Sequence, residues 1–321
     1  MGAPSVEQVM ATGGEHLPGL MAELEERLAA VAADHGGALS VEAGDTIAAG
    51  GKRLRPLLVF LASGPLDDAG GLLRAALAVE LVHSATLVHD DVLDAAELRR
   101  GRPTVVARAG RAMATATGDL LFARAFAELA HNGRADEVRA LSRASSALAL
   151  GELVQRSDAW DVNVPLDRYL WRCELKTARL FEAAAELGGL EGAAPVEPLR
   201  AFGRGIGLAF QILDDVLDVS GPESRTGKRR GTDLLDGTVT LPLILARERD
   251  TSLADLDLRS VSSAEAAEAV CDRIEATGSL AESRERALDI VAAAKAELPP
   301  LPKDRRVPLA LVADSVVERY A

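Results

Sequence analysis

A run of three aspartates occurs twice in this chain with the same intervening residues. Asp-Asp-Val-Leu-Asp is found at residues 90–94 and again at residues 214–218, each time after a mostly apolar stretch. Apolar flanks of this kind predict buried helices. Like charges one helical turn apart repel by roughly 0.2–0.5 kcal/mol, and an unpaired carboxylate taken out of water costs several kcal/mol more. A chain that accepts this arrangement twice is expected to hold a cationic group there.

The spacing of the aspartates indicates which cation this could be. Residues four apart lie on one face of a helix, so the first and third carboxylates of each motif project together. The middle one lies about 100° round the helix. One or two carboxylates for each ion, with water and phosphate completing the shell, is the usual way that Mg²⁺ is held. The alternative is a solvated acidic face, or acidic residues at the N-terminal end of a helix. The six candidate metal ligands are Asp90, Asp91, Asp94, Asp214, Asp215 and Asp218.

Positive charge is scarce in this chain, yet it clusters near the two motifs. One cluster spans residues 52–55 after two glycines, and another spans residues 99–102, shortly beyond the first motif. Lys176 and residues 228–230 add two more. Arginine and lysine are the usual partners of phosphate oxygens. Each cluster alone could be a solvated surface patch, but together with the acidic motifs they predict two diphosphate groups in one cavity.

The composition favours helices and excludes some partners. The chain has 321 residues, 48% of them hydrophobic but only 3% aromatic, and its net charge is −13. Alanine and leucine dominate, which favours helix. The negative charge argues against nucleic acid and against adhesion to anionic lipid. The two cysteines, Cys173 and Cys271, have neither disulfide nor zinc spacing, so we expect thiols in a reducing compartment.

Apolar residues recur at spacings of three and four along almost the whole chain, and strand-like alternation is nearly absent. We therefore expect an all-α fold of ten or more helices. We expect one domain over residues 16–321, preceded by a flexible segment 1–15. Residues 221–231 are expected to form a mobile loop. The absence of a recognisable signal or membrane-spanning stretch predicts a cytoplasmic protein.

The chain resembles the polyprenyl synthetase family of trans-prenyl diphosphate synthases from about residue 50 onward. The matching segments are Gly-Gly-Lys-Arg-Leu-Arg-Pro at 50–56, His-Asp-Asp-Val-Leu-Asp at 89–94, Arg-Arg-Gly-Arg-Pro-Thr at 99–104, Gly-Asp at 118–119, Gly-Glu-Leu-Val-Gln at 151–155, Lys-Thr-Ala at 176–178, Phe-Gln-Ile-Leu-Asp-Asp-Val-Leu-Asp at 210–218, Gly-Thr-Asp-Leu at 231–234 and Thr-Leu-Pro at 240–242. This set of motifs is highly specific.

The resemblance implies long antiparallel helices around a deep central cavity, with the two aspartate helices facing each other across its mouth. It also implies a reaction, the Mg²⁺-dependent head-to-tail condensation of isopentenyl diphosphate with an allylic diphosphate. Two or three Mg²⁺ ions and a homodimer are expected on the same basis. A histidine at 89 is expected to pack against a neighbouring helix.

The resemblance assigns roles to individual residues. Catalysis would rest on Asp90, Asp91, Asp94, Asp214 and Lys176. Arg99, Lys176 and Lys228 would bind the allylic diphosphate. The isopentenyl diphosphate would be held by Lys52, Arg55, His83 and Arg100, and the reacting centre would be lined by Thr177 and Gln211.

The chain departs from the family pattern at one position. Relatives commonly have lysine before the Thr-Leu-Pro segment, whereas this chain has Thr238. The change removes a cation that would be expected near the allylic diphosphate.

Product length in this family is commonly set by the bulk of the side chains one turn before the first motif. Here these residues are Ala85 and Thr86, both small. A helical turn rises about 5.4 Å, so the two side chains would lie just below the diphosphate. Small residues predict a product of C20 or longer, with C30–C50 favoured. The alternative is that Ala85 packs a tight helix crossing and another residue stops the growing tail.

Other functions remain open at this point. A terpene cyclase shares the ionisation chemistry, but it typically has one aspartate motif and does not need the basic pocket at Lys52 and Arg55. A regulatory subunit paired with a catalytic partner usually loses acidic motifs, whereas both are intact here. A purely structural helical protein leaves the repeated motif unexplained.

Overall fold

The computed structural model describes residues 6–33, 37–48, 50–99, 101–221 and 230–318. Its helices are α1 (Val6–Thr12), α2 (His16–Ala33), α3 (Gly37–Ala48), α4 (Leu54–Ser63), α5 (Gly70–Leu93), α6 (Val105–Ala130), α7 (Ala135–Asp158), α8 (Leu166–Cys173), α9 (Arg179–Glu191), α10 (Val196–Ser220), α12 (Thr232–Leu235), α13 (Leu241–Arg247), α14 (Thr251–Ala254), α15 (Ala264–Ala276), α16 (Ser279–Ala296) and α17 (Lys303–Glu318). A π-helical turn at Glu174–Ala178 joins α8 to α9, and a 3₁₀ turn spans Leu258–Ser260.

The prediction of an all-α fold with ten or more helices is confirmed. The only strands in the described residues are β1 (Leu98–Arg99) and β2 (Arg102–Pro103), which pair antiparallel as a short hairpin. Buried apolar side chains from α1 through α17 form one continuous core. The division into domains stays a prediction.

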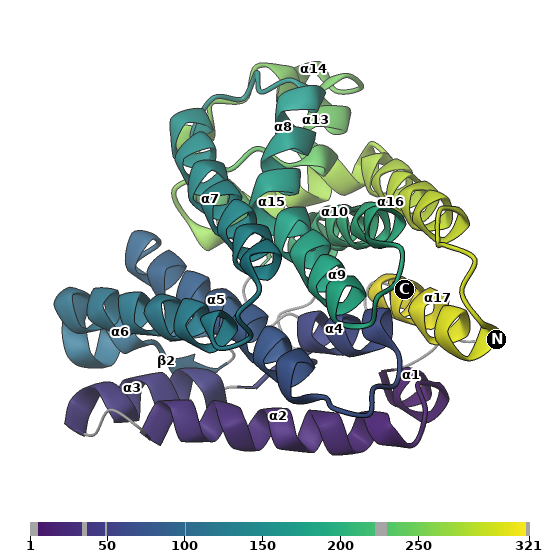
Figure 1. Ribbon diagram of the computed structural model, residues 1–321. Helices are drawn as coiled ribbons and strands as arrows, with labels where there is room; N and C mark the ends of the chain where they lie inside the picture. Colours follow the sequence, from purple (N-terminus) through teal and green to yellow (C-terminus); the bar gives the residue numbers. More distant parts are fainter. Residues whose placement is uncertain (1–5, 34–36, 49, 100, 222–229, 319–321) are drawn as a thin grey trace.

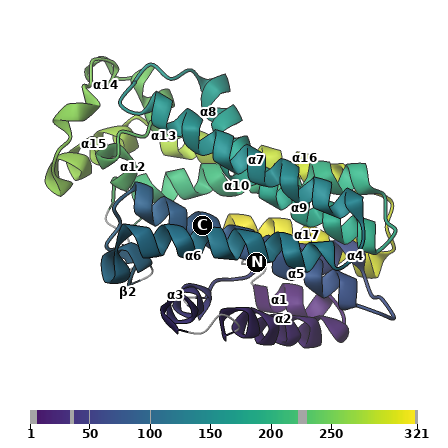
Figure 2. The same ribbon diagram turned by 60° about the vertical axis from the view of Figure 1, so that its left-hand side comes forward.

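The long helices are stacked in layers (Figure 1). Helices α2 and α3 lie below α4, α5 and α6, and α7, α9 and α10 lie above. Turned by 60°, α5, α6, α7, α9, α10, α16 and α17 run side by side, while α12 to α15 gather at one end (Figure 2). Helix α5 therefore lies in the middle of the stack, and its carboxyl end carries the first aspartate motif.

Helix α5 is long and apolar enough to span a membrane by length and composition alone. However, 72% of its most apolar window is buried inside the fold. Neighbouring helices cover it, which is the ordinary reason for an apolar helix in a protein core.

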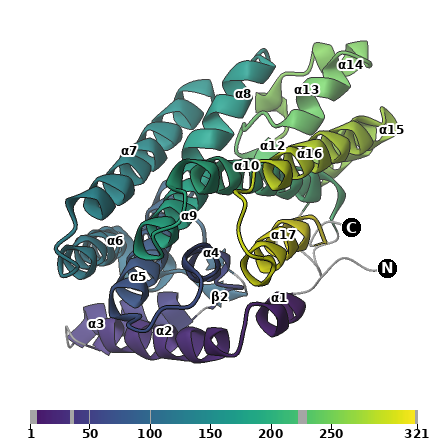
Figure 3. The same cartoon turned by 45° about the vertical axis from the view of Figure 1, so that its right-hand side comes forward.

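Part of the N-terminal segment 1–15, which the sequence predicts to be flexible, is helical; its flexibility stays a prediction. Residues Val6–Thr12 form α1, and the side chain of Val9 has no exposed surface. Helix α1 lies beside α17, as Figures 1 and 3 show. The packing was not foreseen because the partner helix is at the other end of the chain. The expected mobile loop at 221–231 falls mainly on residues 222–229, which lie outside the described residues.

Helices α4 and α9 approach each other closely at a glycine. A Cβ added to Gly188 would lie 2.2 Å from the backbone oxygen of Val59 and 2.8 Å from Cβ of Ala62. Both distances are shorter than real contacts, and a backbone oxygen cannot move aside as a side chain can. This crossing anchors α4, whose N-terminal end carries Arg55 into the cavity described below.

We expect Gly188→Ala to lower the free energy of unfolding by about 1–3 kcal/mol, because the added methyl group forces α4 and α9 apart. The matched control is Gly19→Ala in α2, where an added Cβ meets nothing within 4 Å. Alanine is the better helix former, so the control should raise the stability by up to about 1 kcal/mol. Urea denaturation measures both. Equal free energies of unfolding for the two variants would show that the crossing of α4 and α9 accommodates the added methyl group.

Candidate active site

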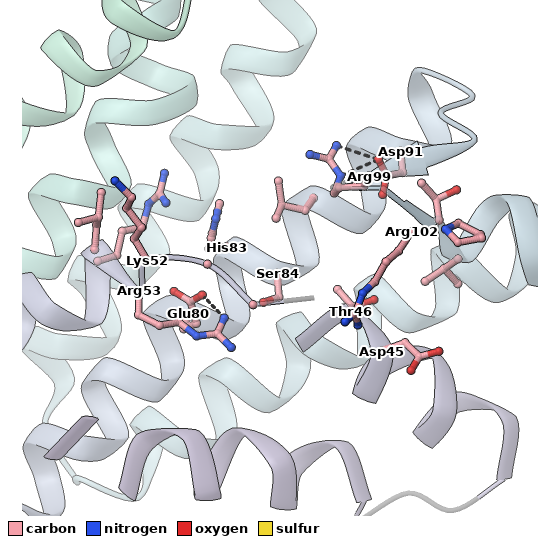
Figure 4. A pocket seen from close by; sticks show the side chains of 18 of the residues that line it. Asp45, Thr46, Lys52, Arg53, Glu80, His83, Ser84, Asp91, Arg99 and Arg102 are labelled. Atoms are coloured by element: carbon pink, nitrogen blue, oxygen red, sulfur yellow. Dashed lines mark hydrogen bonds and ion pairs between the residues drawn. The ribbon is translucent and has the colours of Figure 1, made fainter. Parts of the chain in front are cut away.

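A cavity of about 530 Å³ opens between α3, α5, the β1–β2 hairpin and α10 (Figure 4). Its volume is typical of small-molecule sites. The cavity brings together six of the residues predicted from the sequence. They are Lys52, Arg55, His83, Asp91, Arg99 and Asp214. Carboxylates from both aspartate motifs therefore line the same cavity as the basic residues.

In the first motif, arginines neutralise two of the three carboxylates. Arg99 Nη2 lies 2.7 Å from Asp91 Oδ1, and Asp91 is buried. Arg156 of α7 lies 2.6 Å from Asp94 Oδ1, an ion pair at the protein surface. Because Asp91 and Asp94 each have an arginine beside them, a metal ion that binds there would replace or join that arginine.

Asp90, the first carboxylate of the motif, lies in a less favourable environment. Burial raises its pKa to about 6. The positive charges of Lys176 and Arg99 oppose the rise, whereas the nearby carboxylates of Glu152 and Asp94 add to it. Because neighbouring carboxylates repel one another, this arrangement favours the binding of a cation.

The β1–β2 hairpin positions Arg99 over the first motif. Leu98 pairs with Pro103 and Arg99 with Arg102. The hairpin is fixed by Thr104, whose hydroxyl donates to Ala96 O at 2.5 Å and accepts from Ala107 N at 3.2 Å. Thr104 thus caps α6 and at the same time holds the hairpin in place.

In the second motif, the middle carboxylate is fixed deep in the protein. Tyr169 of α8 donates its hydroxyl to Asp215 Oδ2 at 2.6 Å, and Gln211 Nε2 donates to Asp215 Oδ1 at 2.7 Å. Gln211 in turn accepts from Thr177 Oγ1 at 2.5 Å. Burial and the negative charge of Asp233 raise the pKa of Asp215 to about 8.

The other two carboxylates of this motif are more open. The side chain of Asp214 is exposed and faces the cavity. Asp218 is half-buried, and its Oδ2 accepts from the backbone N of Asp233 at 3.2 Å. The motif therefore presents one carboxylate at the cavity, one at a helix start and one in the core.

Lys176 and Thr177 lie on the π-helical turn Glu174–Ala178. Such a turn inserts a residue into the helix, and it is frequent at functional sites. Lys176 Nζ lies 2.6 Å from Glu152 Oε2 and 3.0 Å from Gln155 Oε1, both in α7. Lys176 is thus placed near Asp90, where its charge acts on the pKa of that carboxyl.

Three further predicted residues form the opposite side of the cavity. Lys52 is exposed, and His83 projects from α5 (Figure 4). The guanidinium of Arg55 lies over the ring of Phe181, 4.5 Å from its centroid. Stacking of this kind holds a guanidinium in place, and the edge of a guanidinium is well suited to bind phosphate oxygens.

Several predicted residues lie elsewhere. Arg100 and Lys228 fall outside the described residues. Ala85 has no exposed surface, and Thr86 is half-buried with its hydroxyl donating to His83 O at 2.8 Å. Neither lines the cavity, so their proposed part in product length stays a prediction. His89 stacks on Phe122 of α6 with ring centroids 5.8 Å apart, which confirms its packing role.

The carboxylate oxygens of the two motifs suit a magnesium ion whose remaining coordination positions are filled by water and by a phosphate ligand. Within the described ranges, no three His, Cys, Asp or Glu side chains come close enough to hold a metal by themselves. The two motifs nevertheless bring oxygen donors from two helices to one cavity. Mg²⁺ commonly takes one or two carboxylates and completes its shell with water and phosphate.

Sequence reasoning missed three residues of the site. Arg156 directly follows the Gly151–Gln155 motif, so the sequence could have predicted that it lies near the site. The sequence could not have predicted its ion pair with Asp94. Tyr169 and Arg172 had no local signal. Arg172 is buried, its guanidinium lies 5.5 Å from the centre of the Tyr169 ring, and it donates to Val239 O.

The raised pKa of Asp215 predicts how stability depends on pH. Burial and the negative charge of Asp233 raise the pKa of Asp215 from the usual value of 3.8 to about 8 in the folded chain, although the hydrogen bonds from Tyr169 and Gln211 oppose the rise. The folded state therefore binds the extra proton, and the free energy of unfolding falls as the pH rises through this window. With EDTA present, Tm should fall from pH 6 to pH 8.5, and Asp215→Asn should flatten that slope.

The control for this experiment is Asp136→Asn. An ion pair with Arg134 lowers the pKa of Asp136, so this carboxylate is ionised in both states above pH 6. Its replacement should leave the slope of Tm against pH unchanged. Identical slopes for wild type and Asp215→Asn would contradict the assignment of the bound proton to Asp215.

Comparison with known proteins places the chain in a family. A sequence profile described as polyprenyl synthetase matches residues 39–275. Heptaprenyl diphosphate synthase component 2 of Geobacillus stearothermophilus is 42% identical over 230 residues, which cover 70% of this chain and 72% of that protein. Octaprenyl diphosphate synthase of Escherichia coli K12 is 36% identical over 264 residues, 80% of this chain and 82% of that protein.

The fold agrees with a solved structure. The polyprenyl synthase from Caulobacter crescentus, crystallised with calcium and isoprenyl diphosphate, superposes with a TM-score of 0.88 at 33% identity, covering 100% of both chains. The match to the family profile, the relatives and this likeness agree with the motifs and the cavity, and the chain belongs to the polyprenyl synthetase family.

Proposed function

We propose that the chain is a prenyltransferase that condenses isopentenyl diphosphate head to tail with an allylic diphosphate to give an all-trans polyprenyl diphosphate. One observation carries the proposal. A single cavity is lined by Asp91 of the first motif, by Asp214 of the second, and by the cations Lys52, Arg55 and Arg99. That is the arrangement needed to hold two diphosphates side by side.

The chemistry needs charge stabilisation at two stages. The allylic C1–O bond breaks, and its electron pair leaves with the pyrophosphate. The double bond of isopentenyl diphosphate attacks the resulting carbocation, so that a new C–C bond forms and a tertiary cation remains. Loss of a proton from the adjacent carbon to the pyrophosphate restores a double bond. Groups that neutralise the leaving pyrophosphate therefore lower the first barrier.

The residues at the allylic end fit this task. Asp90, Asp91 and Asp94, with Asp214 and Asp218 opposite, would hold two or three Mg²⁺ ions, whereas Asp215, predicted from the sequence as a sixth ligand, is held in the core by Tyr169 and Gln211. When bound, Mg²⁺ supplies Lewis-acid charge for the diphosphate oxygens. Lys176 and Arg99 already lie beside the first motif and add fixed positive charge. Support comes from the neighbour crystallised with calcium and isoprenyl diphosphate.

The remaining residues would handle the second substrate and the reacting centre. Lys52, Arg55 and His83 would bind isopentenyl diphosphate, while Thr177 and Gln211, hydrogen-bonded to each other, would face the carbocation. Apolar side chains of Leu87 and Phe210 also line the cavity and limit the access of water. No nucleophilic side chain is required.

The product is proposed to be C20 or longer, with C30–C50 favoured. Ala85 and Thr86 are small, as a long product requires, although neither lines the cavity. Relatives named for heptaprenyl and octaprenyl products also support it.

The proposal extends to the assembly and the location of the protein. We favour a cytoplasmic homodimer. The name of the heptaprenyl relative, component 2, supports a two-component enzyme as the second candidate. A terpene cyclase is disfavoured because both aspartate motifs and the basic pocket are present.

The first test is a single incubation series. Purified protein with Mg²⁺, isopentenyl diphosphate and C5, C10, C15 or C20 allylic primers should yield polyprenyl diphosphates of C30–C50, measured by mass spectrometry. A product that stops at C15 would overturn the assigned length, and failure to condense any primer would overturn the proposed function. Activity that appears only after a second chain is added would favour the two-component enzyme.

The two aspartate motifs should be essential for turnover. We expect Asp90→Asn and Asp214→Asn each to lower kcat at least about a hundredfold, because less leaving-group charge is neutralised in the transition state. The control is Asp304→Asn, an exposed carboxylate in the first turn of α17. Circular dichroism should show all three folded. Wild-type rates in either motif variant would exclude the assigned role.

Arg156 should compete with metal for Asp94. Its exposed ion pair must be broken or shared before a cation can bind, and such pairs are worth about 0.2–1 kcal/mol. We therefore expect Arg156→Gln to lower the dissociation constant for Mn²⁺ by about two- to fivefold, measured by electron paramagnetic resonance without substrate. Arg27→Gln, which breaks a similar exposed pair in α2, is the control. Weaker Mn²⁺ binding in the Arg156 variant would mean that this arginine orients Asp94.

A further inference from the structure

Two charged side chains are buried against the cavity, and the chemistry described above does not use them. Arg53 has 7% and Glu80 4% of its surface exposed, and Arg53 Nη1 donates to Glu80 Oε1 at 2.7 Å. Figure 4 shows this pair close to Lys52 and His83. A buried ion pair is often no more stabilising than apolar side chains of the same volume. Stability alone is therefore a weak reason for it.

The guanidinium of Arg53 joins three separate helices. Its Nε donates to Glu25 Oε1 of α2 at 2.7 Å, and its Nη2 donates to the backbone oxygen of Ile47 in α3 at 2.9 Å. The bond to Glu80 adds α5. Because all three nitrogens are engaged, the side chain has one well-defined position.

That position determines an unusual backbone conformation. Arg53 has φ 46° and ψ 39°, in the left-handed region that residues with side chains rarely adopt. Lys52 precedes it and Arg55 follows two residues later, and both line the cavity. The turn at Arg53 therefore sets the directions in which these two cations leave the backbone.

Glu80 connects the same turn to α5. His83 lies three residues later on α5, on the same side of the helix, and both residues line the cavity. An unpaired carboxylate at this place would repel a diphosphate. Pairing with Arg53 neutralises the carboxylate, and the positive charge of Arg55 also acts on it.

We propose that Arg53 and Glu80 are positioning residues for the isopentenyl diphosphate, fixing Lys52, Arg55 and His83 as one preformed anion site. This inference rests on the proposed function. It differs from a merely structural role in one respect that can be measured. Loss of the pair should weaken binding of isopentenyl diphosphate and leave the allylic diphosphate site, built by other residues, unaffected.

The test uses the full-length Glu80→Gln variant, which keeps the shape of the side chain and removes its charge. We expect KM for isopentenyl diphosphate to rise at least about tenfold, with KM for the allylic diphosphate changed less than about twofold. Calorimetric titration with isopentenyl diphosphate alone should show the same loss without turnover. Glu80→Asp should recover part of the affinity. The second variant is Arg53→Lys, which keeps the charge but loses the guanidinium fork. It should likewise raise KM for isopentenyl diphosphate and leave KM for the allylic diphosphate nearly unchanged.

The matched control is Glu182→Gln in α9. Glu182 is also buried and pairs with two arginines, Arg179 and Arg200, each at 2.7 Å, but it does not line the cavity. This variant should keep both KM values even if its Tm falls.

The outcomes separate the inference from the proposed function. If wild-type protein makes no product with any primer, the proposed function fails. If wild type is active and the Glu80 and Arg53 variants keep their affinity for isopentenyl diphosphate, the positioning role alone fails. A fall in Tm and kcat with both KM values unchanged would also overturn it, since that is the signature of general destabilisation. If Glu80→Gln does not fold, the titration of Arg53→Lys decides.

Discussion

The main physical constraint on this structure is the cost of placing carboxylates in an apolar helical interior. Two identical acidic motifs lie on helices that contribute many side chains to the core, and the low dielectric raises the pKa of Asp90 and of Asp215. Such an arrangement is tolerable only if positive charge is brought to it. Arg99 and Arg156 supply some of that charge from the protein itself. A metal ion with a bound diphosphate would complete the neutralisation, so substrate binding and relief of this repulsion are the same event.

The six aspartates are therefore not equivalent. Asp215 is fixed by Tyr169 and Gln211 and cannot turn toward the cavity without losing two hydrogen bonds. Asp214 and Asp94, in contrast, are exposed and can change partners. A carboxylate fixed deep in the protein and exposed ones at the surface suit a site that must take up and release a charged ligand in every cycle. The hydrogen bonds of Asp215 also extend through Gln211 to Thr177, which joins the second motif to the π-helical turn.

Much of this could be predicted from the sequence, for identifiable reasons. Helical periodicity in an alanine- and leucine-rich chain predicts helices, and the repeated motif predicts where charge must be neutralised. Local patterns do not encode contacts between distant segments. The hydroxyl of Tyr169 and the pairing of Arg156 with Asp94 depend on how α7 and α8 pack beside α5 and α10. The packing of α1 on α17 likewise joins the two ends of the chain. The same limit applies to Ala85, whose small size was visible but whose burial was not.

The departure at Thr238 shows how charge can be supplied from a different element. Thr238 is buried, and its backbone N donates to Asp233 O at 2.8 Å. The guanidinium of Arg172, from α8, donates to the oxygen of the next residue, Val239, and its charge acts to lower the pKa of Asp215. A lysine at 238 would bring a second positive charge into the same buried region, where like charges repel strongly. Among the described residues, Arg172 therefore brings fixed positive charge to the second motif from α8, although Thr238 carries none.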